Sequence, residues 1–233
     1  MKPRHADALF VFGTLLCLTP FLLFGPLQEA YLAWNKAHGM AMSFLKFAIL
    51  ATYGEVIGLR IRTGHYNQPG FGILPRALVW GVLGLTIQAA FQVFAAGTPA
   101  LLAYLGHAEA PSLMQAPLSA GKVGVALAIS TTMNVVYAPW MMTLHKITDT
   151  HIVANGGTLT GLLRPFRFGE VLAGLDWHTL WHFVFKKTIP FFWIPAHTVT
   201  FLLPGEFRAL FAAMLSVALG VFLSVAARRA PTR

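Results

Sequence analysis

Charged residues are scarce in this 233-residue sequence: Asp, Glu, Lys and Arg make up 11% of the chain, and only 8 residues are acidic. Soluble domains are roughly 25% charged. A fold of this size needs more polar surface than that to dissolve in water. The composition therefore excludes a water-soluble globular domain, a disordered chain and a nucleic-acid binder with an aqueous fold. The single cysteine, Cys17, excludes a disulfide framework and a cysteine-based metal site.

Hydrophobic residues make up 56% of the sequence and gather in long runs. A helix of roughly 20 apolar residues spans a bilayer, and the weakly alternating segments of a membrane barrel are not seen. We therefore predict an all-α integral membrane protein, a polytopic bundle of about six transmembrane helices in one domain, 1–233. Its spans are predicted at 8–28, 40–59, 77–98, 123–144, 188–204 and 209–227.

The distribution of basic residues predicts how the chain is oriented. With the N-terminus in the cytoplasm, 13 of the 17 Lys and Arg residues fall in cytoplasmic segments, 3 fall outside and Lys46 lies within a span. Basic connectors are retained on the cytoplasmic side. We therefore expect a multi-pass membrane protein with both termini cytoplasmic, in the plasma (inner) membrane if the source is bacterial. The net charge of +9 is spread over these connectors, which favours a lipid bilayer over nucleic acid as the partner.

The longest connector, 145–187, is predicted to be cytoplasmic and to carry an interfacial helix. Apolar residues there recur at helical spacing opposite polar ones, as in helices that lie on a membrane surface. The apolar residues are Trp177, Leu180, Trp181 and Val184, and the polar ones are His178, His182 and Lys186. The two histidines have the spacing of metal ligands, but Lys186 on the same face would repel a cation. No metal and no cofactor are expected.

Two ionisable residues lie within the predicted span 40–59. Lys46 and Glu55 are nine residues apart, so they face opposite sides of one helix and do not pair with each other. Lys46 is expected to extend its amine to the membrane surface. For Glu55 two interpretations remain: an ion pair with Arg60 or Arg62, or a position facing a pore.

Small and polar residues form stripes on three predicted spans, as in helices that approach one another closely. The stripes are Gly81, Gly84, Gln88 and Gln92; Gly124, Ala128, Thr131, Asn134 and Ala138; and Ala212, Ser216, Gly220 and Ser224. We interpret the last stripe as a packing seam. The polar members of the first two either line a water-filled path or bond to one another.

The predicted span 188–204 is interrupted by Pro195, with His197 two residues later. Broken helices are tolerated at membrane depth where they face protein or a cavity. His197 is therefore either a pore or gating residue, or a histidine bonded to a backbone carbonyl that the proline leaves free.

Three segments follow a pattern of glycine, amide, proline and arginine residues: Gly54-Glu55 to Leu59, Met133-Asn134 to Ala138-Pro139, and Trp193 to Pro204 and Arg208. They resemble motifs of the peroxisomal membrane protein family of about twenty-two kilodaltons, which includes the Mpv-type proteins of the inner mitochondrial membrane. Leu59 stands where that family usually has Gln, and Met133 where it has an acid. The resemblance implies a multi-helix membrane protein, and channel-like permeability is proposed for this family. It also implies a structural role for Gly54, Pro139, Trp193, Pro195, Pro204 and Arg208.

Together these patterns predict a channel-like or transport protein for small solutes. The expected lining residues are Glu55, Gln88, Gln92, Thr131, Asn134 and His197. The alternative is a structural or partner-binding membrane protein whose polar faces are packing seams; a homo-oligomer is possible in either case. An enzyme is not expected, because the sequence contains no nucleophile elbow, phosphate loop or paired carboxylates.

Overall fold

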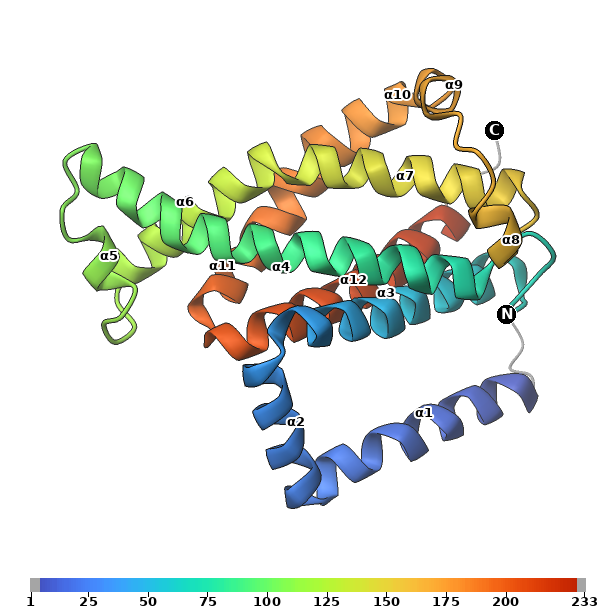
Figure 1. Ribbon diagram of the computed structural model, residues 1–233, viewed down its shortest axis with the longest axis horizontal. Coiled ribbons are helices and arrows are strands. Elements are labelled where there is room, and N and C mark those ends of the chain that lie inside the picture. Colours follow the sequence, from blue (N-terminus) through green and yellow to red (C-terminus); the bar gives the residue numbers. More distant parts are fainter. Residues whose placement is uncertain (1–4, 230–233) are drawn as a thin grey trace.

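The computed structural model describes residues 5–229, and within this range every regular element is a helix (Figure 1). Lys2, Arg4 and Arg233, three of the basic residues counted above, lie outside the described residues. The elements are α1 (His5–Leu23), α2 (Gly25–Ala37), α3 (Gly39–Thr63), α4 (Ile73–Tyr104), α5 (Ala110–Leu113), α6 (Ala120–Val136), α7 (Ala138–Ala154), α8 (Leu159–Leu162), α9 (Phe168–Ala173), α10 (Trp177–Thr179), the π-helix η1 (Leu180–Trp193), α11 (Ile194–Leu202) and α12 (Gly205–Arg229).

Four helices are long and apolar enough to cross a membrane: α1, α3, α4 and the Gly205–Phe222 part of α12. The pair α6 and α7 also qualifies if its 44° bend is part of one span, which gives five. An all-helical chain with four or five such helices has the make-up of a multi-pass membrane protein. The sixth predicted span, 188–204, corresponds to the end of η1 and to α11, which do not reach this length separately.

Two predicted boundaries are wrong. The span 8–28 is interrupted at Phe24, where α1 ends and α2 turns away. The span 123–144 is bent at Tyr137, and α7 then continues to Ala154, ten residues into the predicted connector 145–187. Pro139 explains the bend, because a proline without an N–H is tolerated in the first turn of a new helix but not within one.

Residues 177–202 form one continuous helical run of α10, η1 and α11, so no break separates the predicted interfacial helix from the predicted span 188–204. Asp176 caps its start: the backbone N–H and the hydroxyl of Thr179 donate to its carboxylate at 2.9 and 2.6 Å. These hydrogen bonds lower the pKa of the Asp176 carboxyl group, and the bond from the hydroxyl has the larger effect. Pro195 lies in the first turn of α11, at the end of the wider π-helix, rather than inside a regular α-helix.

Helix α3 packs between α4 and α12, with glycines at both contacts. A Cβ on Gly54 would come within 2.8 Å of the Val217 Cα of α12, and a Cβ on Gly84 within 2.8 Å of the Phe47 Cβ of α3. On α12, Gly220 lies against the Gly54 carbonyl, which confirms the packing role predicted for the last stripe at this position. By contrast, Gly124 of α6 has open space where a side chain would be.

Helix α1 lies apart from the other helices for most of its length, and α2 connects it to the start of α3 (Figure 1). No residue of α1 is buried. Side chains near its start bridge the distance to α3 and to the loop after it: Asp7 pairs with Arg60 at 2.6 Å, and the rings of Phe10 and Tyr66 stack with centroids 4.3 Å apart. The apolar faces of α1 are therefore left for lipid or for other protein.

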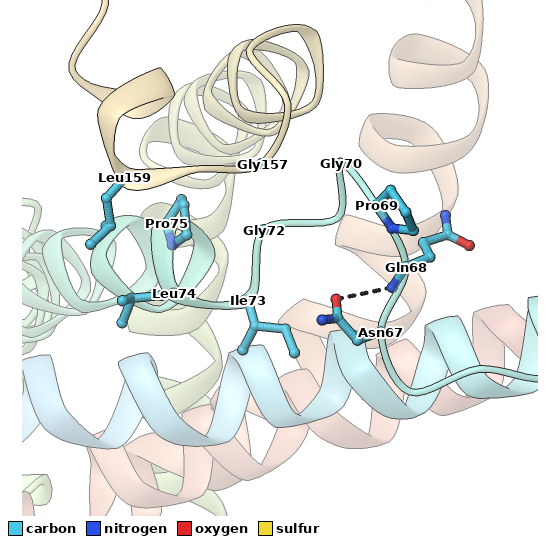
Figure 2. Close-up of a pocket in the computed structure, with 10 residues that line it drawn as sticks. All are labelled: Asn67, Gln68, Pro69, Gly70, Gly72, Ile73, Leu74, Pro75, Gly157 and Leu159. Carbon is cyan, nitrogen blue, oxygen red and sulfur yellow. Dashed lines mark hydrogen bonds between the residues drawn. The ribbon is translucent and has the colours of Figure 1, made fainter.

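The α3–α4 loop lies against the turn between α7 and α8 and closes one end of the bundle (Figure 2). Gly157 in that turn has a φ of 67°, and a Cβ there would lie 2.7 Å from the carbonyl carbon of Gly70. Gly72 has a φ of 73° and faces Gly157 in turn. Only glycine fits such a close contact between two backbones. Because Gly72 directly precedes Ile73, this contact fixes the residue at which α4 begins.

Candidate functional site

Glu55 is ion-paired, but with a residue of another helix. Its Oε2 accepts from the Arg76 guanidinium of α4 at 2.6 Å, and its Oε1 accepts from the Trp80 Nε1 at 2.8 Å. The His145 Nε2 of α7 lies 3.4 Å from the same Oε1. The prediction of Arg60 or Arg62 as partner is therefore wrong. Arg60 pairs with Asp7 instead.

Arg76 is the centre of this cluster, and its side chain is only 8% exposed. Besides Glu55 it pairs with Asp149 of α7, and its Nε donates to the Phe71 carbonyl at 2.7 Å. Buried charges need such partners because desolvation otherwise disfavours them strongly. Glu55, Arg76 and Asp149 thus join three helices through charge.

A polar cavity of about 630 Å³ opens beside this cluster, and we call it the ion-pair cavity. It lies at the α8 end of the bundle, between α3, α4, α7 and α12. Its charged and titratable lining residues are Glu55, Arg62, Arg76, His145, Lys146 and Asp149. Arg62 donates to the buried Ser224 hydroxyl at 2.9 Å, which joins α3 to the end of α12.

A second, much smaller cavity lies beside the middle of α4, where α3, α4, α6, α7, η1, α11 and α12 meet; we call it the central cavity. It offers about 40 Å³ and is lined mainly by apolar and aromatic side chains, with Asn134, His197 and Ser216 as polar members. The indole N–H of Trp193 is buried here without a hydrogen-bond partner in the described part of the chain. This volume is close to that of one water molecule, whose share of liquid volume is about 30 Å³.

His197 is held in the central cavity by aromatic rings. It stacks on Trp193 with centroids 5.1 Å apart and contacts the edge of Phe91 at 5.6 Å. Its Nδ1 lies 3.3 Å from the Thr200 hydroxyl, so the partner is a side chain rather than a freed carbonyl. The Asn134 amide donates to the Ser130 carbonyl one turn earlier at 2.8 Å.

A third cavity, of about 570 Å³, lies at the α5 end, between α4, α6 and the turn from α11 to α12. We call it the basic cavity, because Lys122 and Arg208 are its only charged lining residues. Arg208 donates to the carbonyls of Phe201 and Leu203, at 3.3 and 3.2 Å, and so braces this turn. Gln92 also lines the cavity and is exposed.

The three cavities follow one another along α4. Arg76 borders the ion-pair cavity, Trp80 and Phe91 border the central cavity, and Gln92 borders the basic cavity. From residue 76 to residue 96 the helix rises about 30 Å, the thickness of a bilayer's hydrocarbon core. Glu55 lines the ion-pair cavity and accepts a hydrogen bond from Trp80, which lines the central cavity, so this contact lies between the first two cavities. Phe91 lines the central cavity and is in edge contact at 5.5 Å with Phe201, which lines the basic cavity, so this ring pair lies between the last two.

The predicted lining residues thus fall into different places. Glu55, Asn134, His197 and Gln92 each border one of the three cavities. Gln88 instead lies beside Gly39 at the start of α3, and Thr131 is half-buried on α6; neither borders these cavities. Gln88 and Gln92 do not bond to each other in the described part of the chain.

Lys46 does not extend to the surface as predicted, because its residue is only 6% exposed. Its amine bonds to the Asn35 Oδ1 of α2 and lies 5.5 Å from the centre of the Tyr31 ring. Asn35 in turn donates to the Glu206 carbonyl of α12 at 2.7 Å. Helix α2 folds over the end of α3 and supplies the polar contacts that Lys46 needs.

Sequence reasoning missed Arg76, Trp80, His145 and Asp149 as site residues. They come from α4 and α7, whereas Glu55 comes from α3, so no local spacing connects them. One signal was available: Arg76 directly precedes a long apolar run, where a basic side chain needs an acidic partner at membrane depth.

Comparison with protein-family models, with curated proteins and with solved structures gave no match to this chain.

Proposed function

We propose that this protein conducts a small solute through the membrane along the inner face of α4. The observation that carries the proposal is the row of three cavities, two wide and polar at the ends and one narrow at mid-depth. The narrow part admits about one water molecule, so this arrangement corresponds to a closed pathway. Opening requires movement of the Glu55 cluster at one end and of Phe91 and Phe201 at the other.

The test is solute flux into liposomes that contain the purified full-length protein, with chloride and glycerol as charged and neutral probes. The protein is expected to raise the flux of at least one probe above that of empty liposomes. Asn134→Leu fills the central cavity and removes a polar wall, so we expect it to lower this flux about tenfold.

Val135→Leu is the matched control, because Val135 is 62% exposed on the outside of the same helix. It is expected to leave the flux unchanged. Equal effects of the two substitutions would contradict a route through the central cavity. A folded protein without any flux would favour the alternative, a structural or partner-binding membrane protein.

We further propose six crossings with both termini in the cytoplasm. The continuous run 177–202 supports a crossing by η1 and α11, since it is long enough and packs against α6 and α12. The basic connectors support the orientation. A reporter enzyme fused after Ala110 should be active outside, and one fused after Gly157 should be active inside; the reverse pattern would overturn the six-span proposal.

The resemblance to the twenty-two-kilodalton peroxisomal membrane protein family also remains a proposal. It is supported by where the three motif segments meet: Asn134, Ala138 and Trp193 border the central cavity, and Glu55 borders the neighbouring one. On this view the protein is a channel-like protein and not an enzyme. The exposed faces of α1 are the natural contact for lipid or for a second copy of the chain.

A further inference from the structure

We propose that the basic cavity is a binding site for a phosphate-type oxyanion. Lys122 of α6 and Arg208 of α12 line it together, and no acidic residue is among its lining residues. Neither of the two forms an ion pair with a carboxylate in the part of the chain that the structure describes. This sets the cavity apart from the ion-pair cavity, where Glu55 and Asp149 neutralise Arg76.

The two cations keep hydrogen-bond donors available for a ligand. Lys122 uses one of its three N–H groups, to the Ala116 carbonyl at 2.7 Å. Arg208 uses its Nε and one Nη for the carbonyls of Leu203 and Phe201, which leaves three of its five N–H groups. The carbonyl contacts hold both side chains in place without neutralising them, and Glu206, whose charge acts on Arg208, is exposed and does not line the cavity.

Phosphate chemistry fits these donors best. A tetrahedral oxyanion accepts several hydrogen bonds at once, and an arginine and a lysine presented from different helices are a common means of binding it. Gln92 and Gln115 also line the cavity, and a glutamine side chain carries a neutral amide donor. At about 570 Å³ the cavity accepts an inorganic phosphate ion or the phosphate of a lipid headgroup.

This inference deepens the proposed function, because it assigns a ligand class to one end of the proposed pathway. Binding does not require the pathway to open, so the two proposals are tested separately. Phosphate binding without any flux would overturn the pathway and leave the site. Flux without binding would overturn the site and leave the pathway.

The test uses the full-length protein in a lipid-free maltoside detergent and measures the binding of radiolabelled inorganic phosphate by equilibrium dialysis. Saturable binding is expected. Lys122→Gln removes a charge-assisted hydrogen bond and should weaken binding about tenfold, and Lys122→Arg should restore most of it. Arg208→Gln should also weaken binding, but Arg208 braces a turn, so Lys122 is the decisive position.

Lys36→Gln is the control, because it removes the same charge from an exposed residue of α2 that lines none of the three cavities. If Lys36→Gln weakens phosphate binding as much as Lys122→Gln does, the loss comes from the lower net charge of the protein, and the proposed site is overturned. If free phosphate does not bind, co-purified phosphatidylglycerol is measured by mass spectrometry; retention that depends on Lys122 would identify a lipid headgroup as the source of the phosphate. Absence of both overturns the proposal.

Discussion

Replacing Arg76 by methionine is expected to lower the free energy of unfolding by about 3–5 kcal/mol, the usual cost of breaking a buried ion pair from one side. The substitution leaves Glu55 and Asp149 facing each other without the cation that both contact. The Phe71 carbonyl also loses its donor. Reversible unfolding in mixed detergent micelles measures the change.

Arg62→Met provides the matched control for this prediction. It removes the same kind of charge from the same cavity, but Arg62 is exposed, and among the described residues its side chain hydrogen-bonds only to the Ser224 hydroxyl. The expected loss is about 1 kcal/mol. Adding Glu55→Gln to Arg76→Met should recover part of the larger loss, because one unpaired charge disappears. Similar losses for Arg76→Met and Arg62→Met would show that the Glu55 cluster does not hold α3, α4 and α7 together.

Gly54→Leu is expected to destabilise the protein by about 3 kcal/mol, at the upper end of the usual cost of overpacking. Even the Cβ would come within 2.8 Å of the Val217 Cα, and backbone cannot move aside as a flexible side chain can. Helices α3 and α12 would have to separate, which also disturbs the Gly220 contact and the ion-pair cavity between them. Thermal unfolding of the purified protein reports the effect.

Gly124→Leu tests whether the position, rather than the residue type, determines this result. Gly124 also belongs to a small-residue stripe, yet nothing lies within 4 Å of a Cβ placed there. The substitution should change stability by less than about 1 kcal/mol, with a small gain because leucine favours helix more than glycine does. A large loss at Gly124 would mean that this face of α6 packs against something the single chain does not contain.

The class of fold could be predicted from the sequence because it depends on composition and run length. Pro139 was a sequence signal for the bend at Tyr137. It was missed because the apolar run continues through the bend without a charge. The break at Phe24 was missed for a similar reason, since the apolar residues continue through it into α2. Hydropathy identifies lipid-compatible segments, whereas helix ends depend on individual backbone contacts.

The candidate site was harder to predict, because its contacts join distant helices. The stripe on α4 illustrates the difficulty: Gly81 and Gly84 face α3 as its periodicity indicates, but Gln92 does not. Helix α3 begins at Gly39, opposite Gln88. Gln92 lies one turn further along α4, beyond the start of α3, and therefore does not face that helix. Periodicity predicts the direction of a side chain but not how far the neighbouring helix extends.

The contact of Asn35 with Glu206 bears on how the chain is made. Asn35 and Lys46 leave the ribosome early, whereas the Glu206 carbonyl belongs to the last helix, 171 residues after Asn35. The glycine face of α3 that packs on α12 is likewise uncovered until then. These contacts therefore cannot form until α12 has been synthesised, and the newly inserted helices before it wait in the membrane until then.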